Sequence, residues 1–439
     1  MTKEELTRKR VSAISLGCDK NRVDLEKILF SLRENGFEIV SDPLNAEIVV
    51  VNTCAFILPA KQESINEIIE MEYLKKKGKI EKIIVTGCFP ERNYDELKEN
   101  FPEVDAFVRV KDNSLIPKLI HELYKFENVK HKTNSGRVIT TPISYAYLKI
   151  ADGCNNACSY CIIPRIRGRY KSEKEEDLVK EAEDLVKQGV KELILVAQDV
   201  SRYGEDLYGE NRLIDLCKKL IKIKNLEKIR LHYLYPEKLT KEILDFVAKE
   251  EKMCKYIDIP LQHIDDKILK SMRRRLDEQK TRQLIQSIKE GYKDLAIRTT
   301  FIVGYPGETR RDFKKLFDFV KEMEFDYAGF FPYYREENTA SYFMKKQVRE
   351  YIKKTRLKKI QKLQALISQN KAQKLIGSEE KVLIDDFDES DGCYIAHAET
   401  QSPGVDFGFK VRGENLKVGD FVKVKINSFD GENFGGIKL

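Results

Sequence analysis

Residues 152–164 read DGCNNACSYCIIP and place Cys154, Cys158 and Cys161 in a C-x3-C-x2-C pattern. The apolar run YAYLKI at 145–150 precedes them and is typical of a buried strand. Thiols at this spacing can point into one small volume, and thiolates are the ligands that iron–sulfur clusters prefer. Because a 4Fe-4S cube has four irons, three cysteines leave one iron open to a substrate or cofactor. The motif therefore favours a cluster with one open corner.

A structural zinc site is the alternative for the same thiols. Such sites normally recruit a fourth Cys or His ligand, usually from a second pair. No such residue lies near the motif in the sequence, where the closest histidines are His131 and His232. The iron–sulfur interpretation therefore fits better than zinc.

Three further cysteines occupy equivalent places in the first part of the chain. Cys18 ends VSAISLGC, Cys54 ends EIVVVNTC and Cys88 ends KIIVTGC, so each follows a short run rich in Val and Ile. Such runs are typical of buried parallel strands, and their spacing of 36 and 34 residues fits one βα unit each. Because parallel strands end at one edge of a sheet, we expect the three thiols to converge and to hold a second cluster.

The other three cysteines, Cys217, Cys254 and Cys393, lack this context. A free cysteine is usually a small buried hydrophobe, and we predict that role for all three. Nine cysteines, an odd number grouped by ligand spacing, indicate a reducing cytoplasm rather than a disulfide scaffold. The charged start MTKEELTRKR and the lack of an 18-residue apolar stretch predict neither a secretory signal nor a membrane association.

The 439 residues are enough for two or three domains, and the pattern of elements predicts three. Residues 9–125 alternate strand and helix patterns, which predicts an open parallel βα domain. After a polar linker at 126–142, residues 140–370 contain six βα repeats, fewer than the eight of a closed barrel, and predict a parallel barrel. Residues 373–439 carry short strands between Gly and Asp turns, which predicts a small all-β barrel. The fold class is therefore α/β with an all-β tail.

Polar residues and glycines follow two of the predicted barrel strands. Gln198 and Asp199 end the second strand, where side chains face the site of a barrel. FIVGYPGET ends the fifth, and its Gly304 and Gly307 would let a ligand approach the backbone closely, while Glu308 offers a carboxylate. We expect these five residues to contact the bound cofactor.

Other residues near the predicted strand ends have simpler interpretations. His263 is expected to be a hydrogen-bonded wall residue rather than an iron ligand. Tyr233 and Tyr235 stand where they could line the pocket, although an aromatic residue in a barrel strand usually only packs. Residues 163–168, which follow the last cysteine of the motif, are expected to pack over the cluster. The basic segment 348–374 is expected to be a solvated helix face.

The C-x3-C-x2-C motif resembles the radical S-adenosylmethionine (SAM) superfamily, in which SAM fills the open iron site. This resemblance implies that the barrel of residues 140–370 is an open, partial (β/α)6 barrel. Together with the dispersed cysteines and a tail resembling the TRAM domain, it resembles the methylthiotransferases of that superfamily across nearly the whole chain. The resemblance implies two 4Fe-4S clusters, one on Cys154, Cys158 and Cys161 and an auxiliary one on Cys18, Cys54 and Cys88. It also implies two SAM molecules per product, one as methyl donor and one as radical source, and a reductant such as flavodoxin or ferredoxin.

Two branches of this family compete, one modifying adenosine in tRNA and one modifying an aspartate of small-subunit ribosomal protein twelve. The stretches SLGCDKNRVD, NTCAFILPAKQESINEI, VAQDVSRYG and LYP resemble the ribosomal-protein branch. Charge agrees, because residues 375–439 hold 7 Lys and Arg against 13 Asp and Glu, a net charge of −6. An acidic tail repels RNA phosphates and suits a basic protein. We therefore expect methylthiolation of the aspartate β-carbon of the ribosomal protein, with tRNA as the alternative substrate.

Two interpretations from other classes remain open. A non-catalytic RNA-binding protein with bound metal would explain the tail, but not the three-thiol sets or the negative charge. An electron-transfer protein would explain six cysteines, but not the barrel with its glycine-rich strand end. Reductive conversion of SAM to 5′-deoxyadenosine separates the enzyme from both.

Overall fold

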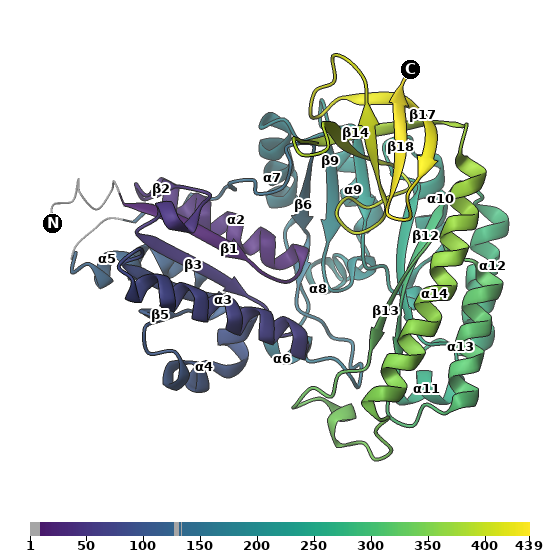
Figure 1. The fold of residues 1–439 in the computed structure, drawn as a ribbon, viewed down its shortest axis with the longest axis horizontal. Coiled ribbons are helices and arrows are strands. Elements are labelled where there is room, and N and C mark those ends of the chain that lie inside the picture. Colours follow the sequence, from purple (N-terminus) through teal and green to yellow (C-terminus); the bar gives the residue numbers. More distant parts are fainter. Residues whose placement is uncertain (1–8, 127–130, 133) are drawn as a thin grey trace. The chain divides into compact units, whose positions relative to one another are not determined.

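The computed structural model describes residues 9–126, 131–132 and 134–439 (Figure 1). The chain forms two compact units. The first comprises residues up to 140 together with 153–155 and 161–169, and the second comprises the remaining residues. The C-x3-C-x2-C motif is thus divided, with Cys154 and Cys161 in the first unit and Cys158 in the second.

The first unit is built on a five-stranded parallel sheet of order β2-β1-β3-β4-β5. Its strands are β1 (Arg10–Ser15), β2 (Glu38–Ile39), β3 (Ile48–Thr53), β4 (Lys82–Gly87) and β5 (Ala106–Phe107). Its helices are α2 (Asp19–Glu34), α3 (Leu58–Lys76), α4 (Cys88–Asn100), α5 (Ile116–Leu123) and the short α6 (Ile163–Ile166). This is the predicted open parallel βα arrangement, with helices on both faces (Figure 1).

Alternate strand residues supply the two cores of this sheet, as the two-residue period of a strand requires. Val49 and Val51 pack with α3 and α4, whereas Ile48 and Val50 pack with α2 and α5. All six residues of β3 are buried, which explains why its first four, Ile48 to Val51, are continuously apolar rather than alternating.

The expected linker is bound to the first unit where the structure describes it. Arg137 forms a buried ion pair with Glu26 on α2, and the backbone N–H and hydroxyl of Thr140 each donate to Glu26 at 2.8 Å. Residues 127–130 and 133 lie outside the described part. Polar composition predicted a solvated linker here, but the polar side chains of its second half are used in long-range contacts.

The second unit contains six parallel strands arranged as two three-stranded sheets, β10-β9-β6 and β11-β12-β13. They are β6 (Tyr145–Lys149), β9 (Glu192–Val196), β10 (Lys228–Leu231), β11 (Tyr256–Gln262), β12 (Ala296–Val303) and β13 (Tyr327–Pro332). The two sheets meet where Ile229 bridges Met253. Among the described residues β6 and β13 pair with no further strand, so the predicted partial barrel is confirmed.

Helices connect these strands, as right-handed crossovers require. They are α7 (Glu175–Lys187), α8 (Glu205–Tyr208), α9 (Leu213–Leu220), α10 (Lys241–Lys249), α11 (Asp266–Ser271), α12 (Glu278–Gly291), α13 (Arg310–Met323) and α14 (Glu350–Leu375). A two-stranded antiparallel ribbon of β7 (Ala151–Asp152) and β8 (Lys171–Ser172) brackets the cysteine motif. Thr240 and Thr309 cap α10 and α13 through their side chains.

A closed five-stranded barrel of order β14-β15-β16-β18-β17 ends the chain (Figure 1). Its strands are β14 (Glu379–Asp388), β15 (Cys393–Ala398), β16 (Gly408–Arg412), β17 (Phe421–Phe429) and β18 (Asn433–Lys438). All its pairings are antiparallel except that of β16 with β18. This confirms the small all-β barrel expected from the turn-rich sequence.

Candidate cluster sites

The three dispersed cysteines follow three neighbouring strands of the first unit. Cys18 comes three residues after β1 and caps α2, Cys54 follows β3 directly, and Cys88 opens α4 after β4. In the sheet, β2 lies on one side of β1 and β3 lies on the other side. The chain therefore reverses its direction across the sheet between β1 and β3, and this place is called the switch point. Ligands of open α/β sheets bind in the crevice at that point. The sequence correctly predicted that these strand ends adjoin.

Two glycines allow this close approach. Gly17 has a φ of +89°, and a Cβ there would lie 2.8 Å from the sulfur of Cys54. Gly87 has a φ of +94°, and its Cβ would lie 2.6 Å from the side-chain oxygen of Asn52. Glycine adopts such φ values without strain, whereas a side chain would be strained and would clash. The glycine before Cys18 therefore brings Cys18 and Cys54 together.

A buried arginine stands beside these thiols and was not singled out from the sequence. The Arg167 guanidinium donates to Asp24 at 2.5 Å, to Asn21 at 2.7 Å and to the Cys88 sulfur at 3.5 Å. Arg167 follows α6, whose Ile166 packs in the core beside Phe89. Residues 163–168 were expected to cover the cluster of the C-x3-C-x2-C motif, and they contact cysteines of both sets: the Gly168 oxygen accepts from the Cys154 N–H, and Arg167 donates to Cys88.

Asn21 organises the polar groups around this site. Its side-chain N–H groups donate to Leu16 at 2.8 Å and to Thr53 at 3.0 Å, and its backbone oxygen accepts from the Asn52 side chain at 2.6 Å. These bonds link the first turn of α2 to the loops after β1 and β3. Backbone oxygens that would otherwise be buried without partners are thereby satisfied.

Burial dominates the electrostatic environment of the thiols. Burial raises the pKa of Cys88 to about 12, and while Arg167 opposes the rise, the nearby Cys18 and Cys54 add to it. Burial likewise raises the pKa of Cys54. Each thiol must lose its proton when it binds iron, so binding releases protons and becomes less favourable in acid. Cys18 and Cys54 are therefore both close enough to act on the charge of Cys88.

The chemistry of the donor set, three thiols, fits an iron–sulfur cluster. Within the described ranges, no three His, Cys, Asp or Glu side chains meet closely enough to hold one metal ion. The thiols of an iron–sulfur cube bind different irons, so they surround the group and need not meet at one point. Three converging thiols at a glycine-lined edge satisfy that requirement.

The cysteine motif itself lies in a loop that starts after β7. In the first unit, the Cys154 N–H donates to the oxygen of Gly168 at 3.1 Å. In the second, the Cys158 sulfur lies 2.8 Å from the Tyr235 hydroxyl and 3.9 Å from Nη1 of Arg274. Tyr235 therefore reaches a motif cysteine instead of only packing.

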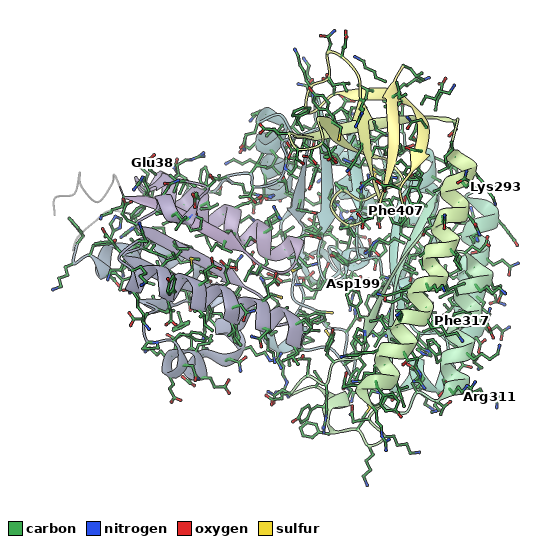
Figure 2. The ribbon with its side chains drawn as sticks, in the orientation of Figure 1. Glu38, Asp199, Lys293, Arg311, Phe317 and Phe407 are labelled. Carbon is green, nitrogen blue, oxygen red and sulfur yellow. The ribbon has the colours of Figure 1, made fainter. Side chains whose placement is uncertain are left out.

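The end of β9 lies against the same loop, as its two candidate residues show. Gln198 donates to Asp152 at 2.9 Å, and the Asp199 carboxylate accepts from Asn156 at 3.0 Å and from Ser201 at 2.5 Å. Burial raises the pKa of Asp199, while the bonds from Ser201 and Asn156 oppose the rise. Figure 2 shows Asp199 among the strands of this unit, while Arg311 marks α13 at its outer edge.

The side chain of Glu308, which was expected to contact a cofactor, stabilises the loop after β12. Glu308 accepts from the Gly304 N–H at 2.6 Å and pairs with Arg356 on α14 at 2.7 Å. A Cβ on Gly304 would strike Lys353, so that glycine is required by the approach of α14. By contrast, Gly307 has a φ of +86° and open space where a Cβ would point. Of the two glycines, only Gly307 has room for a ligand.

Residues 148–320 match the family model of the radical SAM superfamily, residues 10–109 that of Uncharacterized protein family UPF0004, and residues 376–436 that of the TRAM domain. The chain is 44% identical over 439 residues to a "Ribosomal protein uS12 methylthiotransferase RimO" of Acetivibrio thermocellus, covering 96% of this chain and 97% of that protein. It is 45% identical to a protein of the same name from Thermoanaerobacter sp., covering 95% of this chain and 97% of the relative. The chain belongs to the RimO family of methylthiotransferases.

Solved structures place the fold of this RimO-family chain among radical SAM enzymes. The methyltransferase TsrM from Kitasatospora setae, solved with cobalamin and a [4Fe-4S] cluster, matches with a TM-score of 0.54 at 15% identity, covering 76% of this chain and 77% of TsrM. The cobalamin-dependent enzyme OxsB, solved with SAM and aqua-cobalamin, matches with a TM-score of 0.50 at 13% identity, covering 82% of this chain and 56% of OxsB. In the described part of the chain, every helix is too short or too polar to cross a membrane.

The negative charges of the acidic tail are not all exposed, although attraction of a basic protein by the whole tail would require that. Asp385 is buried and accepts from Ser144 and His397, each at 2.7 Å. Asp386 and Glu389 are exposed. The remaining cysteines Cys217, Cys254 and Cys393 are buried, as predicted.

Proposed function

We propose that this protein transfers a methylthio group to the β-carbon of an aspartate in ribosomal protein uS12, using two SAM molecules and two 4Fe-4S clusters. The convergence of Cys18, Cys54 and Cys88 at the switch point carries the proposal, because a radical SAM enzyme without a second cluster would not need it. The RimO name of the relatives supports uS12 as the substrate. The net charge of −6 in the tail supports a basic protein over tRNA.

Each set of thiols has its own part in this proposal. Cys154, Cys158 and Cys161 would hold the radical SAM cluster, and Cys18, Cys54 and Cys88 the auxiliary cluster. When bound, the first supplies the electron that cleaves SAM to a 5′-deoxyadenosyl radical, and the second carries the sulfur to be methylated and transferred. A flavodoxin or ferredoxin would deliver the electron.

The residues of this chain would position and neutralise these groups. Arg167 places a positive charge beside Cys88, which favours the deprotonated ligand that iron requires. We assign SAM contacts to Gln198, Asp199 and the Gly304–Gly307–Glu308 loop. Glu308 would act on SAM through the loop, because its carboxylate already accepts from the loop backbone and pairs with Arg356. The proposed domains are residues 9–125, 140–370 and 373–439.

The test is anaerobic reconstitution with iron and sulfide, followed by incubation with SAM, a reductant and recombinant uS12. We expect 5′-deoxyadenosine, and a uS12 peptide heavier by a methylthio group in place of one hydrogen, located on aspartate by fragmentation. Unmodified tRNA offered in parallel should stay unmodified. Methylthiolated adenosine in tRNA with unchanged uS12 would reject the substrate, and no 5′-deoxyadenosine would reject the radical mechanism.

A further inference from the structure

Tyr235 contacts a cysteine of the motif through its hydroxyl. It precedes the 3-10 helix η4 (Pro236–Lys238) after β10, and its oxygen lies 2.8 Å from the Cys158 sulfur. Its backbone N–H donates to Ser201 at 3.1 Å, which fixes the start of the side chain. Tyr235 is partly buried, and a tyrosine hydroxyl withdrawn from water usually takes a hydrogen-bond partner, which here is sulfur.

Arg274 holds the other side of this tyrosine. The guanidinium carbon lies 4.0 Å from the centre of the Tyr235 ring, and Nη2 donates to the Pro260 oxygen at 2.8 Å. Its Nη1 is 3.9 Å from the Cys158 sulfur. The ring and the carbonyl together set the plane of the guanidinium, so its charge is held at a defined distance from the sulfur.

The positive charge of Arg274 is buried close to Cys158. Only 8% of the residue is exposed, and Glu237 is a nearby carboxylate that acts on its charge. A buried cation is stabilised by negative charge near it, which an iron-ligating thiolate at Cys158 would add.

We propose that Tyr235 and Arg274 are positioning residues that raise the reduction potential of the cluster bound by Cys158. The Tyr235 O–H donates to the thiolate, and Arg274 adds a positive charge next to it. Reduction adds one negative charge to the cluster, and both groups stabilise that charge more than the oxidised state. This inference rests on the proposed function and adds a control over the electron needed for SAM cleavage.

The experiment is a redox titration of the reconstituted full-length protein, followed by electron paramagnetic resonance of both clusters. Tyr235→Phe keeps the ring under Arg274 and removes only the hydroxyl. We expect a lower midpoint potential for the SAM-binding cluster, an unchanged potential for the other cluster, and unchanged iron content. Tyr292→Phe is the matched control, because it removes a hydroxyl bonded to Asp245 at 2.6 Å near the end of α12. It should shift neither potential.

Arg274 gives a second, graded comparison. Arg274→Gln removes the charge and should lower the same potential more than Tyr235→Phe, while Arg274→Lys should recover part of the loss. With a fixed reductant, the kcat of SAM cleavage should fall in the same order, with little change in the KM for SAM. A fall in affinity for SAM with an unchanged potential would show that these residues shape the SAM pocket instead, and would overturn the inference.

The unaltered protein provides a readout that does not depend on a variant folding well. Exchange into D2O should remove a strongly coupled proton from the electron–nuclear double resonance spectrum of the reduced SAM-binding cluster. An unchanged spectrum would overturn the inference, as would an unshifted potential in Tyr235→Phe with full iron content. Absence of a SAM-binding cluster from the unaltered protein would instead reject the proposed function itself.

Discussion

The two sets of cysteines reach their positions by different means. Cys154, Cys158 and Cys161 are separated by only a few residues, so a short loop is sufficient to gather them. Cys18, Cys54 and Cys88 are spread over 71 residues and are gathered by the register of β1, β3 and β4. The first set depends on local sequence and the second on the completed sheet, so damage to the first unit should affect the two clusters unequally.

We expect the largest effect from removing the three cysteines of the C-x3-C-x2-C motif. Replacing Cys154, Cys158 and Cys161 with Ala should reduce the bound iron from about eight atoms to about four, because each 4Fe-4S cube holds four. The variant should produce no 5′-deoxyadenosine, since no open iron remains for SAM. Iron analysis and chromatography of the reaction measure both. Loss of all the iron, or of none, would show that the two sets are not independent.

Loss of the dispersed set should have a different result. Replacing Cys18, Cys54 and Cys88 with Ala should also remove about half of the iron, but reductive cleavage of SAM should persist. The methylthio product should disappear, because the auxiliary cluster supplies its sulfur. Chromatography for 5′-deoxyadenosine and mass spectrometry of uS12 separate the two steps. Formation of methylthiolated uS12 by this variant would contradict an essential auxiliary cluster.

A glycine substitution should affect the dispersed set alone. Gly17→Ala introduces a Cβ 2.8 Å from the Cys54 sulfur at a φ of +89°. We expect about half of the iron to be lost, with SAM cleavage retained. Gly78→Ala is the control, because it has a φ of +70° in the same unit but open space around the new Cβ. It should cost only the backbone strain of about 1 kcal/mol and keep all the iron. If Gly17→Ala and Gly78→Ala lost equal amounts of iron, backbone strain and not the clash with Cys54 would be the cause of the loss.

The same contrast between local and long-range determinants explains what could be predicted from the sequence. Apolar runs such as residues 145–150 depend only on nearby residues, and they correctly predicted strands such as β6. Cys18, Cys54 and Cys88 could be predicted to converge because parallel strands share an edge. The contact of Arg167 with Cys88 joins residues 79 positions apart, and polar pairings of this kind follow no periodicity. Burial of Asp385 was missed for the same reason.

Asp385 and Asp386 are neighbours in sequence with opposite environments. Asp385 accepts from His397, whose other nitrogen lies 3.1 Å from Glu192 on β9. Glu192 also pairs with Arg230, so the small barrel and β9 share one buried network of charges. Burial alone lowers the pKa of His397, but Asp385 and Glu192 outweigh it and raise the pKa to about 9.

This network predicts a pH dependence of stability. Because the folded-state pKa of His397 is raised from 6.5 to about 9, its contribution is complete below pH 6.5 and is lost as the pH rises through 9. Thermal unfolding should show a falling Tm across that window, and His397→Gln should flatten the fall. Asp385→Asn should cost about 3 kcal/mol and Asp386→Asn less than about 0.5 kcal/mol. A Tm of His397→Gln that falls as steeply as that of the unaltered protein would contradict the assignment.

The smallest expected effect concerns the exposed carboxylates of the tail. Changing Asp386, Asp388 and Glu389 to Asn or Gln leaves the buried Asp385 intact and removes three negative charges near the tip of β14. If the tail attracts the basic uS12, the KM for uS12 should rise a few-fold at low salt, and the difference should disappear at high salt because ions screen exposed charges. SAM cleavage without uS12 should be unchanged.

The control variant removes three negative charges elsewhere, by changing Glu242, Glu290 and Asp294 to Gln or Asn. These residues are exposed on the helical side of the partial barrel, so the KM for uS12 should stay unaltered. An equal KM for both variants at low salt would mean that the acidic residues of the tail only keep its surface hydrated.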